Sequence, residues 1–138
     1  MALFKTQRRV EFRDTDAAGI VHFSVFFTYM EAAEHELLRS LGLSVLDRDA
    51  AGTVTWPRVA ARCDYQSAIR FDDLVTIEVH VSRLGRKSVT YSFAFTCGER
   101  QVATGEITAV CCRLGAGGEL QSILIPEPLA DKLKALTI

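Results

Sequence analysis

The spacing of hydrophobic positions predicts one long amphipathic helix near the start of the chain. Between His22 and Leu41, apolar residues recur at intervals of three and four, which is the period of one helix face. Gly42 follows, where helices commonly place a glycine just after their last turn. This apolar set consists of Phe23, Phe26, Phe27, Met30, Ala33, Leu37, Leu38 and Leu41.

Five other segments have the patterns of β-strands. Four of them alternate apolar and polar residues, which is typical of a strand with one buried face. The last is apolar on both faces and is expected to be covered on both sides. In chain order the segments are 4–14, 59–65, 75–81, 89–97 and 101–114.

The remaining stretches connect these elements or end the chain. Residues 43–53 carry Asp47, Asp49 and Gly52, and they predict a loop or a short helical turn. Pro128 suits the first position of a short C-terminal helix that continues through Leu136.

The order of elements predicts one α+β domain over residues 1–138. An antiparallel sheet must bury its apolar face, and the 22–41 helix carries the largest apolar surface available to cover it. We therefore expect a curved sheet of about five strands wrapped around that helix.

Composition narrows the possible functions. A net charge of −1 gives no electrostatic case for binding nucleic acid or an anionic membrane. No apolar run reaches the roughly 18 to 20 residues of a membrane span, and the charged start does not suit a secretory signal. A cytoplasmic location is the expectation.

The four cysteines, Cys63, Cys97, Cys111 and Cys112, lack metal-ligand spacing and are expected to be reduced core residues, so no metal is predicted.

The segment between the first strand and the long helix carries the residues best suited to chemistry. Asp14 and Asp16 lie two residues apart, Gly19 relaxes the backbone, and the helix then begins. A helix N-terminus offers unpaired N–H groups that can stabilise an oxyanion, and a nearby carboxylate can act as base or nucleophile. The alternative is that both aspartates are turn or capping residues, as acids before helices usually are.

The residues of this segment resemble those of a known family. The run Glu11-Phe12-x-Asp14-x-Asp16-x-Ala18-Gly19-Ile20-Val21, followed by Glu31-Ala32-Ala33, is similar to the 4-hydroxybenzoyl-CoA thioesterase family of hotdog-fold proteins. Later segments also resemble the family: Pro57-x-Val59 with Tyr65, the stretch 71–78, and the basic turn Arg86-Lys87-Ser88.

The resemblance implies a hotdog-fold acyl-CoA thioesterase that needs no cofactor, since coenzyme A is part of the substrate. It implies a homodimer joined edge to edge, usually doubled to a homotetramer, with active sites at subunit boundaries. Asp16 matches the catalytic aspartate, a nucleophile in some members and a general base in others. The backbone N–H of Phe23 matches the donor that polarises the thioester. Arg86, Lys87 and Ser88 match a turn that binds the CoA phosphates in some members.

Several further residues are candidates for substrate binding. Gly19 and His22 lie beside the proposed site, and His22 either hydrogen-bonds near the thioester or only packs. Glu31 matches an acid near the acyl ring in hydroxybenzoyl-specific members, but a structural ion pair explains it equally well. Trp56 could line an acyl pocket or anchor a sheet edge. An acyl site of unknown length could also use Phe26, Phe27 and Tyr65.

Two other functions compete with the thioesterase. One is a hotdog-fold dehydratase or hydratase acting on acyl thioesters, which would use a catalytic histidine such as His22. The other is an acyl-CoA-binding protein without catalytic activity.

Overall fold

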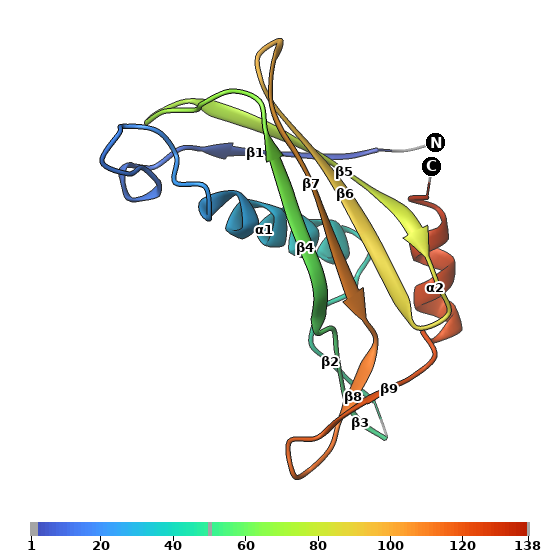
Figure 1. Cartoon of the computed structure of the whole chain (residues 1–138). Coiled ribbons are helices and arrows are strands. Elements are labelled where there is room, and N and C mark those ends of the chain that lie inside the picture. The colour runs from blue at the N-terminus through green and yellow to red at the C-terminus, as the bar shows by residue number, and fades with distance from the viewer. Residues whose placement is uncertain (1–2, 50, 138) are drawn as a thin grey trace.

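The computed structural model describes residues 3–49 and 51–137, with the side chain of Asp49 left out. A long helix, α1, lies against a curved five-stranded antiparallel sheet of order β1-β5-β6-β7-β4 (Figure 1). This arrangement confirms the predicted α+β architecture. The bounds are α1 Val25–Ser40, β1 Phe4–Arg9, β4 Arg58–Tyr65, β5 Leu74–Leu84, β6 Ser88–Cys97 and β7 Arg100–Val110.

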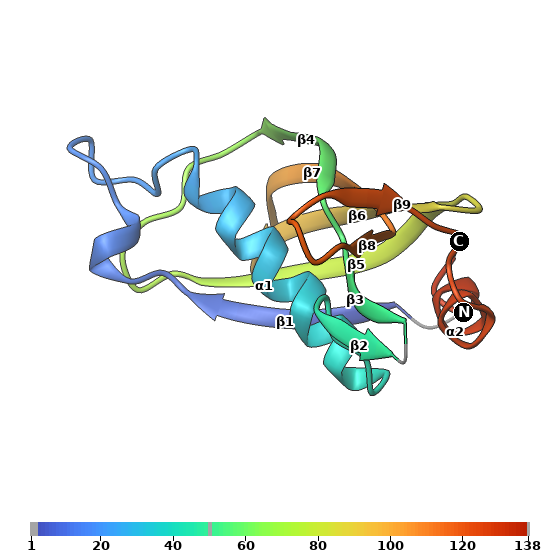
Figure 2. The ribbon, with the colours of Figure 1, turned by 90° about the horizontal axis from the view of Figure 1, so that it is seen from below.

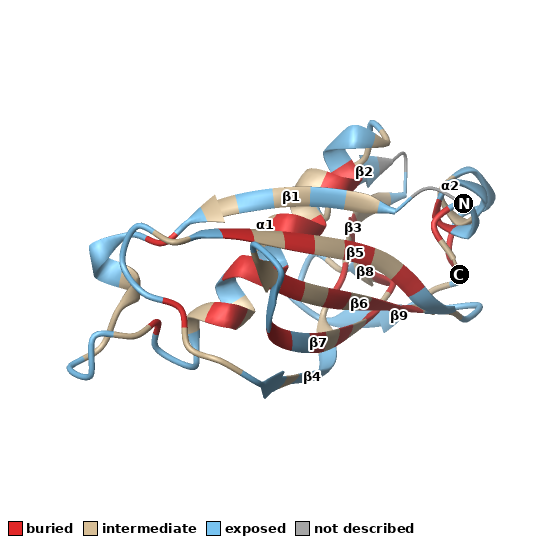
Figure 3. Ribbon diagram, turned by 90° about the horizontal axis from the view of Figure 1, so that it is seen from above, coloured by how far each residue is buried: buried red, intermediate tan, exposed pale blue. Residues whose placement is uncertain are grey.

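The core lies between α1 and the concave face of the sheet. Alternate residues of β5 and β6 are buried, as the predicted period of two requires (Figure 3). From the helix, Met30 and Leu37 are fully buried against them. Gly105 on β7 permits this close approach, because a Cβ at that position would lie 2.5 Å from Sδ of Met30.

One charged pair is also enclosed by the helix and the edge strand β4. The carboxylate of Glu34 is only 1% exposed, and Oε1 lies 2.6 Å from the guanidinium of Arg58. Its other oxygen accepts a hydrogen bond of 2.7 Å from the same side chain. The buried charge is therefore paired, which avoids most of the cost of an isolated charge in the core.

A second, smaller sheet is a feature that the sequence did not predict. It has the order β2-β3-β8-β9, with bounds β2 Asp47–Asp49, β3 Gly52–Thr55, β8 Cys112–Leu114 and β9 Leu120–Ser122. The predicted loop over 43–53 is therefore wrong in part. The predicted single strand over 101–114 breaks at Cys111, whose N–H donates to the carbonyl of Lys87 at 2.7 Å. The chain then leaves the main sheet for the small one.

Three predicted boundaries shift. β1 stops at Arg9, because Phe12–Asp14 forms a 3-10 turn, η1, in which Phe12 is 77% exposed and packs edge-on against Phe71. Helix α1 begins at Val25 rather than at His22, because residues 22–24 form a turn of their own. The C-terminal helix α2 spans Glu127–Lys134, so Pro128 is its second residue and Leu136 lies beyond it.

The two ends of the molecule carry different elements. The segment between β1 and α1 lies at one end, and α2 lies at the other, beside the turn that joins β5 to β6 (Figures 1 and 2). Within the part of the chain that the structure describes, no helix has the length and apolar character needed to cross a membrane.

Candidate active site

Asp14 holds the segment between β1 and α1 in place through three hydrogen bonds. Its Oδ2 accepts hydrogen bonds from the N–H of Glu11 at 2.9 Å and from the hydroxyl of Tyr29 at 2.8 Å. Its carbonyl accepts the N–H of His22 at 2.9 Å. Burial of Tyr29, and then its bond to Asp14, raise the pKa of this phenol well above its ordinary value. Asp14 thus fastens the segment to helix α1, which agrees with its interpretation as a turn acid.

Asp16 sits in a tight turn that Gly19 completes. The N–H of Gly19 donates to the carbonyl of Asp16, and the N–H of Ala18 donates to Oδ1 of Asp16, both at 2.9 Å. The N–H of Asp16 donates to the carbonyl of Ile20 at 2.9 Å, and Gly19 has a φ of +79° that suits glycine. The other carboxylate oxygen of Asp16, Oδ2, accepts no hydrogen bond from the described residues, 3–49 and 51–137. Asp16 is therefore a turn residue with one carboxylate oxygen still available.

Asp16 lines a cleft of about 350 Å³. One wall comes from the Asp16 segment and the start of α1, and the other from the chain that follows β4. The residues around it are Asp16, Ile20, Val21, Phe23, Phe26, Tyr65, Gln66, Ser67, Ala68 and Ile69. The lining is mostly apolar with one carboxylate, a composition that suits an apolar group carrying a reactive polar centre.

Phe23 lies on the same cleft, immediately before α1. Its backbone N–H has no acceptor among the residues that the structure describes, while its carbonyl accepts the hydroxyl of Tyr65 at 2.8 Å. The N–H groups at the start of a helix lack intrahelical acceptors and carry partial positive charge. The residue that carries this free N–H therefore lines the same cleft as Asp16.

His22 lies outside the lining of the cleft. Its Nδ1 is 2.8 Å from Oγ of Ser24 and accepts the N–H of Ser24 at 3.3 Å, and its ring centre is 4.6 Å from that of Phe23. The side chain bonds to Ser24, the N-cap residue of α1, and packs on an aromatic ring. This geometry supports the packing interpretation of His22.

Glu31 and Trp56 also lie away from the cleft. The carboxylate of Glu31 is 56% exposed and 3.9 Å from the guanidinium of Arg58, an ion-pair distance. Trp56 lines a different hollow, which it shares with Leu43, Val54 and the start of α2. Of the four aromatic candidates for an acyl site, the structure brings Phe26 and Tyr65 to the cleft, but not Phe27 or Trp56.

The predicted CoA-binding turn joins β5 to β6, and it lies at the opposite end of the molecule from the segment between β1 and α1, which bears Asp16 (Figure 1). Arg86 and Lys87 are exposed, and their carbonyls accept the N–H groups of Ile125 at 2.9 Å and Cys111 at 2.7 Å. Ser88 begins β6, and Arg86 lines a hollow next to α2. A single chain therefore does not unite Asp16 with this turn.

The loop Gln66–Ile69 is the part of the cleft that the sequence did not predict. These residues fall between two predicted strands and show neither alternation nor a recognisable motif. Their position follows from tertiary hydrogen bonds, such as that from the N–H of Val21 to the carbonyl of Ile69 at 2.8 Å. The only available signal was that the chain leaves the 59–65 strand at Tyr65 and so begins this loop beside it.

Neither a metal site nor a disulfide is seen in the part of the chain that the structure describes. No group of three or more His, Cys, Asp or Glu residues there has a geometry that could hold a metal ion. The cysteines are free: Cys111 and Cys112 are buried, and Cys63 and Cys97 are half-buried.

A curved antiparallel sheet wrapped around one central helix is the hotdog fold. Residues 10–133 match the thioesterase-like superfamily. The chain belongs to this superfamily, and it is an enzyme of the thioester hydrolase class.

Three similar proteins illustrate the relationship. A 1,4-dihydroxy-2-naphthoyl-CoA hydrolase from Synechococcus elongatus is 30% identical, with 97% of each chain covered. A 4-hydroxybenzoyl-CoA thioesterase from a Pseudomonas species is 33% identical over 87 residues, which is 59% of this chain and 60% of the relative. The crystal structure of a 1,4-dihydroxy-2-naphthoyl-CoA thioesterase from Synechocystis has a TM-score of 0.86 at 23% identity, with 98% of each chain covered, and shows the shared fold.

Proposed function

We propose that this protein hydrolyses an acyl-CoA thioester to a free acid and coenzyme A in the Asp16 cleft. The observation that carries the proposal is that Asp16 and Phe23 line one cleft. In the described part of the chain, Asp16 has a carboxylate oxygen without a donor, and the N–H of Phe23, just ahead of α1, has no acceptor. Acyl transfer needs these two parts, a base or nucleophile and an oxyanion donor.

The chemistry follows from these two groups. As a general base, Asp16 takes a proton from water while the water oxygen bonds to the thioester carbon, and the Phe23 N–H holds the resulting oxyanion. Collapse of this intermediate breaks the C–S bond, and the leaving thiolate takes the proton back from Asp16. As a nucleophile, Asp16 instead bonds to the thioester carbon, releases the CoA thiolate, and leaves an anhydride that water hydrolyses.

A homodimer would unite the two halves of the predicted site. Strand β4 is an edge of the main sheet, and Val59 on it is 63% exposed. Antiparallel pairing of two β4 edges reverses one chain relative to the other. The Asp16 end of one subunit would then share an end of the joined sheet with the Arg86–Ser88 turn of the second copy. We propose this dimer, doubled to a homotetramer, as the active form, with the basic turn on the CoA phosphates.

The cleft lining and the names of the relatives bear on the acyl group. The relatives are named for aromatic hydroxyacyl-CoA substrates, and Phe26 and Tyr65 place two aromatic rings on the cleft. Aromatic acyl-CoAs are thus the first class to test, alongside short-, medium- and long-chain aliphatic ones. Release of the CoA thiol, followed with a colorimetric thiol reagent, gives kcat and KM for each.

Asp16→Asn is the decisive variant, because it keeps the shape of the side chain and removes its basicity. We expect kcat to fall by at least about 10²-fold while the folded state is retained. Full activity in this variant would refute the assignment. Hydration of an enoyl-CoA without thiol release would favour the dehydratase or hydratase, although the cleft is lined by no histidine among the described residues. Tight acyl-CoA binding without turnover would instead identify a binding protein.

A further inference from the structure

We propose that Arg100 is a positioning residue for the active site, although it does not line the cleft. The residue begins β7, just after the turn that joins β6 to β7. Its side chain holds the loop 66–73, whose first part, Gln66–Ile69, forms one wall of the cleft. This loop in turn supports the segment that bears Asp16. The inference rests on the proposed function, because it concerns the same cleft.

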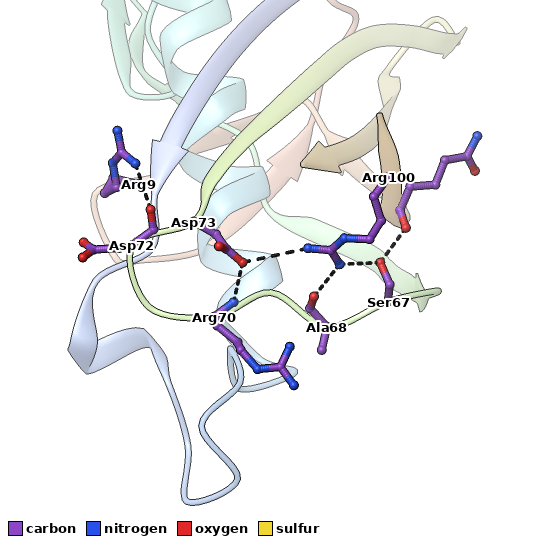
Figure 4. A network of polar contacts seen from close by, with 8 residues as sticks. Arg9, Ser67, Ala68, Arg70, Asp72, Asp73 and Arg100 are labelled. Carbon is purple, nitrogen blue, oxygen red and sulfur yellow. Dashed lines mark hydrogen bonds and ion pairs between the residues drawn. The ribbon is translucent and has the colours of Figure 1, made fainter. Parts of the chain in front are cut away.

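The guanidinium of Arg100 contacts both ends of the loop (Figure 4). Nη1 donates to the carbonyl of Ala68 at 2.6 Å and to Oγ of Ser67 at 2.9 Å. Nη2 lies 3.9 Å from Oδ2 of Asp73. A planar group with several donors can bridge sites that a single ammonium cannot reach together.

The residues that Arg100 contacts are themselves fixed within the loop. Oδ2 of Asp73 also accepts the N–H of Arg70 at 2.8 Å, which closes the far end of the loop. The hydroxyl of Ser67 donates to the carbonyl of Gln101 at 2.7 Å, which ties the near end to β7. Arg100 therefore connects the two fixed ends of the loop, the end at Ser67 and the end at Asp73.

This wall supports both ends of the Asp16 segment. At the end nearer α1, the N–H of Val21 donates to the carbonyl of Ile69 at 2.8 Å, next to the Ile20 carbonyl that accepts the N–H of Asp16. At the other end, Val10 exchanges two backbone hydrogen bonds with Asp72 and Asp73, of 3.0 and 2.9 Å.

The backbone of the loop depends on these contacts for its shape. Asp72 has a φ of +71° and is the one described residue other than glycine with a positive φ. L-residues rarely adopt this conformation unless surrounding contacts impose it. Besides its bond to Val10, Asp72 accepts a hydrogen bond of 2.8 Å from Nη1 of Arg9 at its carbonyl. Losing the Arg100 anchor should let the wall relax, and the Asp16 carboxylate should shift with it.

The kinetic test compares Arg100→Ala and Arg100→Lys with the wild type in thiol release. The matched control is Arg39→Ala, an exposed arginine in the last turn of α1, far from the cleft. We expect Arg100→Ala to lower kcat by about 10- to 100-fold, since small misplacement of reacting groups costs rates of this size. Arg100→Lys should be intermediate, and Arg39→Ala should match the wild type. Added guanidinium ion should restore part of the activity of Arg100→Ala but not of Asp16→Asn.

Hydrogen exchange provides a test that does not depend on turnover. In Arg100→Ala, the hydrogen-bonded amides of Val21 and of residues 66, 67, 70, 72 and 73 should exchange at least about 10-fold faster, while amides in β5 and β6 keep their rates. Unchanged exchange and unchanged kcat in Arg100→Ala would overturn the inference. If that variant fails to fold, Arg100→Lys takes its place in the same measurement. An inactive wild type with these exchange changes would instead refute the proposed function and leave the structural link in place.

Discussion

The hydroxyl of Tyr65 donates a hydrogen bond of 2.8 Å to the carbonyl of Phe23. This contact joins the end of the edge strand β4 to the residue that lies just ahead of the first turn of α1. Partial desolvation, together with the neighbouring Cys63, raises the pKa of Tyr65 to about 12, so the phenol is a neutral donor throughout the physiological range. The bond fixes the orientation of the residue whose N–H is the proposed oxyanion donor.

We expect Tyr65→Phe to lower kcat by roughly 5- to 10-fold, with thermal stability close to that of the wild type. The physical reason is that the Phe23 backbone becomes free to rotate, which weakens one oxyanion hydrogen bond without removing it. Steady-state kinetics with a good acyl-CoA substrate measure the change. A variant with altered KM and normal kcat would show that Tyr65 serves acyl binding instead.

Gly19→Ala should damage activity more than stability. Gly19 has a φ of +79°, and no atom lies within 4 Å of the position that a Cβ would occupy. The cost is therefore backbone strain, of about 1 to 2 kcal/mol, rather than a clash. Relief of that strain would distort the turn that holds Asp16. Urea unfolding and kcat should be measured together.

The matched control is Gly118→Ala, which has a φ of +89°, equally open surroundings and a place in the turn before β9, far from the cleft. It should lose similar stability and keep full activity. Equal losses of activity in both variants would contradict a specific role for the Gly19 turn.

The periodic parts of the sequence predicted the architecture well, because burial on one face imposes a period on each element. The β5 and β6 alternation and the α1 stripe are of this kind. The small second sheet escaped prediction because its strands are only three or four residues long, too short to show a period.

The site was predicted only where local sequence determines local structure. The Asp16 turn and the helix start are close in sequence, and the family resemblance covers them. The Gln66–Ile69 wall and its Arg100 anchor depend on contacts between residues more than thirty positions apart. No pattern of single residues records such contacts. The distance between Arg86 and Asp16 within one chain likewise could not be predicted without the order of the strands in the sheet.

Gly105→Ala should destabilise the fold by about 1 to 3 kcal/mol, because a Cβ would meet Sδ of Met30 at 2.5 Å and the carbonyl of Arg62 at 3.1 Å. Chemical denaturation measures the loss. The double variant Gly105→Ala/Met30→Ala provides the control. If the clash with Met30 dominates, the double variant should lose less unfolding free energy than the sum of the losses of the two single variants. Strict additivity would instead locate the cost in the backbone of β4.

Alkaline conditions should reveal the hydrogen bond between Tyr29 and Asp14. The folded pKa of Tyr29 is raised above its ordinary value of 10.0, so the unfolded chain loses this proton first as pH rises. The stability that Tyr29 contributes is therefore fully present below about pH 10 and declines above it, by up to about 1.4 kcal/mol per pH unit. Tyr29→Phe removes this titration together with a bond worth roughly 1 to 3 kcal/mol. Urea unfolding of both proteins from about pH 8 to about pH 11 should show a stability difference that is constant at first and shrinks above about pH 10. A difference that stays constant over the whole range would mean that the folded pKa of Tyr29 is close to its ordinary value.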